Sequence, residues 1–415
     1  MTKHLEQYPK EDHGIFKKDI DPDVYLISDS LINNGYQAFV VGGCIRDILL
    51  GKAPKDFDIA TDASPSEICK LFKHAKIIGR RFKIVHVYVS EKKYFEVSTF
   101  RSDVKNKINQ KKFKKVKGMI KRDNIYGSIS QDAFRRDFTI NSLYLDLDSQ
   151  ILHDYVNGLN DINQKKLRLI KKPSISYQED PVRMLRAVRF ESKLNLKLTK
   201  ECKEAILKMS HMINDVSPYR LFDEILKIMH SGSGVDGYKK LRELDLLKYL
   251  FPFTYKILLN NEIYNDFIIA AIKNTDSRIN DGLHVNPSFI YAVFLWPYFQ
   301  ELEENFSNSK TMDELFKKVI HDQSKFIAIP DFFQSTIFSI WSLQSSFLNL
   351  SKRNASYLTG FSKFRAAYDF FYIRSLINDD LKRFADHWYE IQKNVVNKKR
   401  DKGRNFNDRR NKRKY

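Results

Sequence analysis

The sequence has little cysteine and no long apolar run, and these absences exclude several classes of protein. Cys44, Cys69 and Cys202 are odd in number and scattered without metal-binding spacing, which suits a reducing compartment. The most apolar window, residues 283–299, is interrupted by polar residues and prolines, so it lacks the about 20 apolar residues of a membrane span. The charged N-terminal segment lacks the apolar core of a signal peptide. We therefore expect a cytoplasmic protein with no transmembrane segment.

Acidic residues are outnumbered, and the excess of positive charge is unevenly distributed. The chain has 71 Lys and Arg against 51 Asp and Glu, a formal net charge of +20. Nine Lys or Arg and no acid lie between Lys105 and Arg122, and ten Lys or Arg lie between Lys398 and Lys414. Both are solvated charge runs, and we expect the second to be disordered. Such segments favour polyanions as partners, nucleic acid first among them.

The pattern of apolar residues changes along the chain, and a length of 415 residues predicts two to four domains. The first 150 residues alternate apolar runs with turns, as in an α/β domain. The predicted elements there are a strand at 38–41, a helix at 45–50, a strand at 56–60, a helix from Ser64, and a hairpin of 77–89 with 94–100. From about Gln178 the pattern becomes helical, and Pro252, Pro287, Pro297 and Pro330 are expected to divide the later helices. There is no internal repeat.

Asp56-Phe57-Asp58 is the first group of residues with chemistry in it. In a strand, residues i and i+2 share a face, so both carboxylates would lie together while Phe57 turns into the core. Hard divalent ions such as Mg²⁺ are commonly bound by one or two carboxylates plus substrate phosphates. The pair alone is also compatible with two surface acids.

A glycine pair precedes this group in the segment VVGGCIRD, residues 40–47. Gly42 and Gly43 lack a Cβ atom, so backbone N–H groups there could approach a phosphate closely. The helix that follows would direct its positive end to the same place, and Arg46 would add a charge-assisted bond. The alternative is a plain turn with a surface arginine.

These segments resemble the first motif of the class II nucleotidyltransferases, the superfamily of bacterial poly(A) polymerases and CCA-adding enzymes. Four further motifs of that family are matched in order, at Phe134–Leu143, at Asp154–Asp161 with Gly158, at Glu179–Arg183, and at Arg220, Glu224 and Lys227. The resemblance implies an α+β fold, with an N-terminal mixed-sheet nucleotidyltransferase head followed by an all-helical neck, body and basic tail. The expected boundaries are 1–150, 151–245, 246–395 and 396–415.

The resemblance also implies a role for each matched residue. Asp56 and Asp58 would bind two Mg²⁺ (or Mn²⁺) ions, with Glu96 as the third carboxylate. Asp137 would contact the nucleotide and also support the metal site. Asp137 could also cap a helix, and Glu96 could be an edge-strand acid. The residues expected to bind the ATP substrate are Gly42, Gly43, Arg46, Arg135, Arg136, Asn141, Asp180, Arg183 and Arg186. Among them, Asp180 and Arg183 would read the base. Arg186, and Arg189 after it, continue the row of arginines at a spacing of three residues. These two could stack on the base, bind phosphate, or simply be exposed.

Three features favour a poly(A) polymerase, which would add AMP from ATP to RNA 3′ ends without a template and so promote RNA turnover. They are the segment Ile77–Val87, the segment Tyr126–Asp137, and Lys363–Asp369 together with the basic tail. A CCA-adding enzyme is the second hypothesis, and a non-catalytic RNA-binding protein is the third. RNA 3′ ends are the expected partner, and the RNA-degradation machinery is a candidate.

Overall fold

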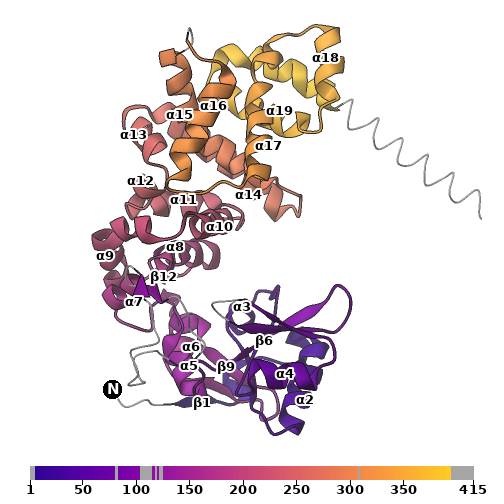
Figure 1. The fold of residues 1–415 in the computed structure, drawn as a ribbon, viewed down its shortest axis with the longest axis vertical. Helices are drawn as coiled ribbons and strands as arrows, with labels where there is room; N and C mark the ends of the chain where they lie inside the picture. The colour runs from indigo at the N-terminus through magenta and orange to yellow at the C-terminus, as the bar shows by residue number, and fades with distance from the viewer. Residues whose placement is uncertain are drawn as a thin grey trace, which may run out of the picture. The chain divides into compact units, whose positions relative to one another are not determined.

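The computed structural model describes residues 5–79, 83–102, 125–306 and 309–393, and the backbone of 115–116 and 119–120. The chain divides into two compact units, Met1–Asp215 and Val216–Tyr415 (Figure 1). Apart from those four backbone positions, the basic segment 105–122 lies outside the described residues, as does the tail 396–415. The four-part division expected from the sequence stays a prediction. No helix in the described part of the chain is long and apolar enough to cross a membrane.

The first unit is built on an eight-stranded mixed sheet, as the sequence predicted. Its strand order is β1-β10-β9-β2-β3-β6-β5-β4. The strands are β1 (Glu6–Tyr8), β2 (Ala38–Val41), β3 (Asp58–Thr61), β4 (Ala75–Ile78), β5 (Ile84–Tyr88), β6 (Tyr94–Thr99), β9 (Leu143–Asp146) and β10 (Leu152–Asp154). β3 and β6 are parallel, and their neighbours pair antiparallel. Two-stranded sheets join β7 (Lys115–Val116) to β8 (Met119–Ile120) and β11 (Lys166–Leu167) to β12 (Lys197–Leu198).

The helices of this unit follow local signals in the sequence. They are α1 (Lys10–His13), α2 (Pro22–Asn33), α3 (Gly43–Leu49), α4 (Pro65–Leu71), α5 (Ile129–Arg135), α6 (Gly158–Asn163), α7 (Pro173–Glu179), α8 (Val182–Leu194) and α9 (Lys200–Met209), with 3-10 turns η1 (Lys17–Asp19), η4 (Thr139–Asn141) and η5 (Ser210–Asp215). Ser64 caps α4 as predicted: its Oγ accepts the N–H of Glu67 at 3.4 Å, and Glu67 accepts the N–H of Ser64 at 2.7 Å. The reciprocal bonds fix where α4 begins.

Two details of the predicted strands were wrong. The segment 77–89 is not one hairpin arm, because β4 ends at Ile78 and β5 begins only at Ile84. The predicted strand 56–60 begins two residues later, at Asp58, so Asp56 precedes the strand and Phe57 is only half-buried rather than in the core. The paired carboxylates therefore do not arise from strand alternation alone.

The two faces of the sheet differ in character. On one face a row of apolar residues, Val40, Ile59, Val97 and Val85, is fully buried, and α2 and α4 pack against the strands. The adjacent row on the other face runs through Asp58 and Glu96, which are only partly buried. This second face is also buried at β2 and β9, where Val41 and Tyr144 belong to a second core cluster, and it carries charged residues from Asp58 onward.

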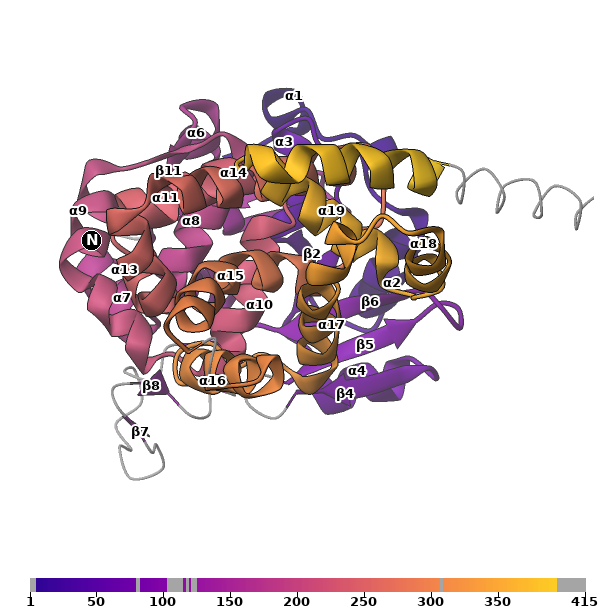
Figure 2. The same cartoon turned by 90° about the horizontal axis from the view of Figure 1, so that it is seen from above.

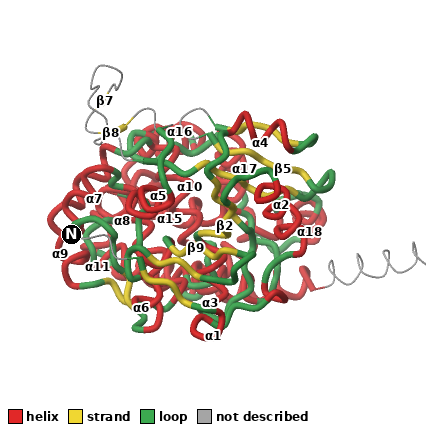
Figure 3. The backbone as a smooth tube through the Cα atoms, turned by 90° about the horizontal axis from the view of Figure 1, so that it is seen from below, coloured by secondary structure: helices red, strands yellow, loops and turns green. Residues whose placement is uncertain are grey.

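Every element described in the second unit is a helix, as predicted, and Figure 3 colours these helices red. It contains α10 (Pro218–Met229), α11 (Gly234–Glu243), α12 (Leu247–Leu250), α13 (Pro252–Asn260), α14 (Glu262–Asn280), α15 (Pro287–Phe306), α16 (Met312–Ser324), α17 (Asp331–Ser342), α18 (Lys352–Thr359) and α19 (Phe364–Ser375), with η6 (Ser345–Leu348) and η7 (Asp379–Leu381). Residues 382–393 are also helical. Pro297 does not divide two helices but lies inside α15, a helix buried by its neighbours over Ser288–Phe299.

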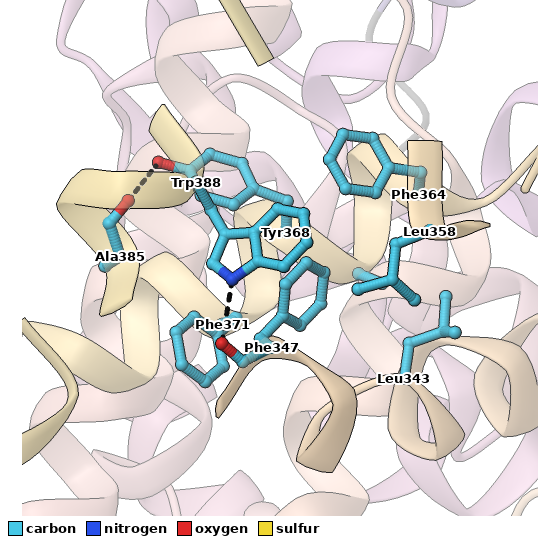
Figure 4. Close-up of a cluster of buried hydrophobic side chains, with 9 residues drawn as sticks. Leu343, Phe347, Leu358, Phe364, Tyr368, Phe371, Ala385 and Trp388 are labelled. Carbon is cyan, nitrogen blue, oxygen red and sulfur yellow. Dashed lines mark hydrogen bonds between the residues drawn. The ribbon is translucent and has the colours of Figure 1, made fainter. Parts of the chain in front are cut away.

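Near its C-terminal end, this unit encloses a core of nine buried side chains (Figure 4). Phe347 is fully buried at its centre, and its ring meets the Trp388 ring edge to face at 5.2 Å. The Trp388 indole donates to the Phe347 carbonyl at 2.7 Å, so the polar end of a buried aromatic side chain is satisfied. Phe364 and Tyr368 belong to the same core, so these residues of the Lys363–Asp369 segment serve packing.

Truncation of this core gives the first prediction. Phe347→Ala removes a fully buried ring and should lower the free energy of unfolding by roughly 3–5 kcal/mol, since lost transfer energy and a cavity add. Phe332→Ala is the matched control, because Phe332 is 75% exposed. Urea denaturation followed by tryptophan fluorescence would measure both, and equal stability of the two variants would contradict the packing role.

Candidate active site

Three acidic residues lie near one another where β3 begins beside β6. Asp58 opens β3 and pairs in register with Glu96 of the parallel strand β6. Asp56 lies two residues before Asp58 and is exposed, and its charge acts on Asp58. Phe95 and Val97, on either side of Glu96, are buried, so Glu96 faces away from the core, as the sequence predicted.

The environment of Asp58 disfavours its charge. Burial, followed by the negative charge of Glu96, raises the pKa of Asp58 to about 6, with a smaller contribution from Asp56 and against the opposing effect of Arg136. A perturbed carboxyl beside two others indicates a functional site. Among the described residues, no group of three His, Cys, Asp or Glu side chains is arranged to hold a metal ion. An ion bound here would therefore also need oxygens from its substrate.

Gly42 lies directly against this acidic group. It has a φ of +81°, and a Cβ atom there would lie 3.3 Å from Arg136 Nη1 and 3.6 Å from Asp58 Oδ2. A side chain would therefore be strained in conformation and would crowd both groups. Gly43 begins α3. The predicted turn between β2 and α3 thus brings backbone next to Asp58.

Arg136 is fixed by a buried network that the sequence did not reveal. Its Nε donates to Tyr144 Oη at 2.8 Å and to Asp132 Oδ2 at 3.2 Å, and its Nη1 donates to the Asn141 carbonyl at 3.3 Å. Burial opposes the charge of Asp132, but Arg136 and the Tyr144 hydroxyl lower the pKa of Asp132 overall. Arg135, the next predicted residue, is partly buried at the end of α5.

A second network joins residues of the first and second motifs to Arg186 of α8. Asp137 accepts Arg186 Nε at 2.6 Å and Asn141 Nδ2 at 3.1 Å, and Asn141 Oδ1 accepts Arg46 Nη1 at 2.7 Å. Arg46 also donates to Asp47, at 2.6 Å. Although burial opposes it, Arg186 and these hydrogen bonds lower the pKa of Asp137 to about 2. Asp137 also accepts the N–H of Phe138. It does not cap a helix, however, because the N-cap of α5 is Ser128 and the N-cap of η4 is Phe138.

Positive groups gather around Phe190 on α8. The guanidinium carbons of Arg46, Arg186 and Arg189 lie 5.1, 5.3 and 4.9 Å from its ring centroid. Burial, together with Lys55, Arg46 and Arg189, lowers the pKa of Lys193. Such a concentration of cations suits a polyphosphate. Phe190 and Lys193 were missed from the sequence, although Lys193 continues the spacing of Arg186 and Arg189 at i+4.

The third motif has a structural role. Asp154 accepts the N–H groups of Val156 and Leu159, at 3.0 and 2.9 Å. Asp161 is buried and accepts Thr139 Oγ1 at 2.8 Å. A Cβ atom on Gly158 would lie only 2.4 Å from the Thr139 carbonyl oxygen. The motif therefore holds η4, the turn that contains Asn141, in close contact with α6.

The predicted base-reading pair lies where α7 meets α8. Asp180 ends α7, and the Arg183 N–H donates to its carbonyl at 3.1 Å. Arg183 Nη1 donates to Ser176 Oγ at 2.7 Å. Arg183, Arg186 and Arg189 are all partly buried while residues between them are buried, so the predicted row along one helix face is present.

The fifth motif lies in the second unit. Arg220, Glu224 and Lys227 belong to α10, as predicted for a helix there. Glu224 is buried and pairs with Lys227 at 3.3 Å.

Comparison with known proteins identifies the class of this site. The family model of the poly A polymerase head domain matches residues 38–168, that of a probable RNA and SrmB-binding site of polymerase A matches 195–258, and that of the polymerase A arginine-rich C-terminus matches 304–415. A solved CCA-adding enzyme in complex with ATP has the same fold, with a TM-score of 0.64 and 20% identity over 94% of this chain and 86% of that one. A Thermotoga maritima CCA-adding enzyme has a TM-score of 0.60 and 20% identity over 91% and 84%. Fold and site therefore define a nucleotidyltransferase of the class shared by poly(A) polymerases and CCA-adding enzymes.

Similarity along the whole chain separates the two kinds of enzyme. Poly(A) polymerase I of Salmonella typhi is 38% identical over 94% of this chain and 86% of that protein, and that of Haemophilus influenzae is 36% identical over 94% and 90%. The CCA-adding enzyme of Bacillus pumilus is 35% identical but over only 49% of this chain and 48% of that protein. The chain belongs to the poly(A) polymerase I family, the polynucleotide adenylyltransferases.

The raised pKa of Asp58 gives a prediction for the protein without divalent ions. The pKa of this carboxyl is higher in the folded than in the unfolded protein. The folded state therefore loses stability as the pH rises from about 4 to above 6. Asp58→Asn removes this loss, so at pH 7.5 in EDTA the variant should exceed the wild type by roughly 2–3 kcal/mol in free energy of unfolding, and at pH 4 the difference should vanish. Asp148→Asn, at an exposed turn, is the control. The same pH dependence in all three proteins would contradict the prediction.

Proposed function

We propose that the chain adds AMP from ATP to RNA 3′ ends without a template, using Asp56, Asp58 and Glu96 to hold divalent metal ions. The supporting observation is the grouping of these carboxylates beside Gly42 and a cluster of arginines, in a chain similar to poly(A) polymerase I over 94% of its length. The raised pKa of Asp58 and its hard oxygen donors fit Mg²⁺ or Mn²⁺. When bound, two such ions lower the pKa of an attacking hydroxyl and stabilise charge on phosphate oxygens.

The residues of the chain perform the remaining steps. Arg46, Arg186 and Arg189, with Lys193, bind the triphosphate and neutralise the charge that moves to pyrophosphate. Asn141, held by Arg46 and Asp137, and Arg136, with its partly buried neighbour Arg135, contact the phosphates and ribose. Asp137 keeps Arg186 oriented rather than touching the reacting atoms. Gly42 lets the phosphates approach Asp58 without obstruction.

Asp180 and Arg183 are proposed to read the base. A carboxylate acceptor and a guanidinium donor match the donor and acceptor pattern of an adenine edge, and Ser176 holds Arg183 in place. Without a template, this fixed geometry is what discriminates between nucleotides.

The RNA partner is supported by the match of residues 195–258 to the probable RNA-binding family model and by the net charge of +20. Charge-based contacts release counterions and bind RNA without regard to sequence. A role in RNA turnover and contact with the degradation machinery belong to the same proposal.

Loss of a carboxylate tests the chemistry. Asp56→Ala should reduce AMP addition to the level seen without enzyme, because a ligand of the ions is removed, while leaving the affinity for RNA unchanged. An unstructured RNA primer, Mg²⁺ and each nucleoside triphosphate supplied separately provide the assay. The wild type should give a long ladder with ATP alone, and Asp148→Ala should behave as the wild type.

Two outcomes would overturn the proposal. Full activity in Asp56→Ala would exclude the assigned site, and addition limited to CCA on a tRNA-like end would indicate a CCA-adding enzyme.

A second experiment tests base reading. Arg183→Ala should lower kcat/KM for ATP by roughly 10–100-fold, as expected for one lost hydrogen bond to a charged group, and lessen the preference for ATP over the other triphosphates. Arg183→Lys keeps the charge but not the planar fork, so it should not restore that preference. An unchanged ratio of kcat/KM values among the four triphosphates would exclude Arg183 as a base reader.

A further inference from the structure

The charged face of the sheet continues past Glu96 into strands that the proposed mechanism does not use. The register places Asp58 opposite Glu96, Glu96 opposite His86 of β5, and His86 opposite Lys76 of β4. Partners in register share one face of a sheet, so the four side chains form one row. Figure 2 shows β6, β5 and β4 side by side. The row spans three strand spacings, about 14 Å.

Aromatic rings cluster on this part of the face. The Tyr94 ring stacks on His86, with centroids 4.2 Å apart and planes inclined by 13°, and Tyr88 lies 5.5 Å from Tyr94. His86 Nε2 lies 3.5 Å from Glu96 Oε1, so the cluster begins beside the carboxylates. Tyr94 is 46% exposed. We call His86, Tyr88 and Tyr94 the aromatic ledge.

Tyr94 is the exposed ring of the ledge, whereas His86 and Tyr88 are partly buried, and its exposure is not a consequence of loose packing. Val85, Val87 and Val97, which alternate with the ledge and with Glu96, are buried on the opposite face, and α4 packs against β4, β5 and β6. The strands are therefore anchored, and they hold their rings outward on a rigid support. An exposed ring supported by partly buried rings on an anchored sheet is the kind of surface on which nucleic-acid bases stack.

Positive charge follows the ledge toward the sheet edge. Lys76 Nζ lies 5.8 Å from the Tyr88 ring centroid. A cavity of about 570 Å³ adjoins it, and the charged and aromatic side chains that line it are Lys73, His74, Lys76, Tyr88 and Glu91. Two lysines against one carboxylate leave it positive, which suits phosphate.

We propose that the aromatic ledge binds the last bases of the RNA primer by stacking, and that Lys76 and Lys73 bind phosphates of the nucleotides before them. This deepens the proposed function and rests on it. On the other flank of Asp58, β2 leads to Gly42 and α3, where Arg46 and the remaining arginines take the triphosphate. The ledge lies on the opposite side of Asp58 from β2. A primer bound there would place its 3′ hydroxyl at Glu96 and Asp58, and ATP would bind on the β2 side.

The first experiment measures the effect of the ledge on KM for the primer and on KM for ATP separately. With a short oligoadenylate primer, Tyr94→Ala should raise KM for the primer roughly tenfold, as expected for one lost stacking contact, with KM for ATP and kcat nearly unchanged. Tyr94→Phe keeps the ring and should match the wild type, which excludes a role for the hydroxyl. Titration of the same oligoadenylate without ATP, by fluorescence anisotropy, should show the same loss of affinity in the alanine variant.

The second experiment concerns the phosphates. Lys76→Ala should lower the slope of log affinity against log salt concentration by about 0.7, the value for one lost contact with a single strand. Lys70→Ala is the matched control, since Lys70 is exposed on α4, which packs on the opposite face, and it should leave the slope unchanged.

The outcomes are distinguishable. A wild-type protein that makes no poly(A) from ATP refutes the proposed function. An active wild type whose primer KM and salt slope are insensitive to Tyr94→Ala and Lys76→Ala refutes only the ledge. A rise in KM for ATP alone would assign the ledge to the nucleotide instead, and would overturn the inference as well.

Discussion

The site depends on the parallel pairing of β3 with β6, which brings Asp58 and Glu96 into register. Burial of Asp58, and next the negative charge of Glu96, raise the pKa of Asp58, so the folded arrangement disfavours its charged form. The strands keep these two carboxylates together because residues on their opposite face, such as Ile59 and Val97, are buried in the core. The apolar core thus holds together a charged arrangement that would separate on its own.

The arginines around the site are held by a different interaction, ion pairs with acids outside the proposed metal-binding group. Asp132 holds Arg136, and Asp137 holds Arg186. Each arginine keeps only part of its hydrogen-bonding capacity for a ligand, but it is already oriented when the ligand arrives. Pre-oriented charge of this kind lowers the reorganisation needed during a reaction. The low pKa of Asp137 means that this support stays charged at any pH near neutrality.

Local signals in the sequence predicted much of this, because they act over a few residues. The capping box at Ser64 and Glu67 fixed the start of α4, and alternation around Glu96 gave its orientation. Motif order supplied the candidate residues, but not their partners. The pairs Arg136–Tyr144 and Arg46–Asn141 join positions 8 and 95 residues apart, and Phe190 at the centre of the cations resembles any core residue in sequence. Pro297 inside α15 shows the same limit, since surrounding helices override a local breaker.

The two proposed substrates make different kinds of contact, and this explains why one can be selected strictly and the other loosely. A base read by Asp180 and by an Arg183 held against Ser176 must match fixed donors and acceptors, and a mismatch leaves polar groups unsatisfied. A base lying on Tyr94 presents only its ring face, which every base has. Lysines likewise bind any phosphate. An enzyme that extends different RNA ends with one nucleotide requires this asymmetry. In our proposal, the row from Asp58 to Lys76 supplies the permissive contacts on the same sheet as the proposed catalytic carboxylates.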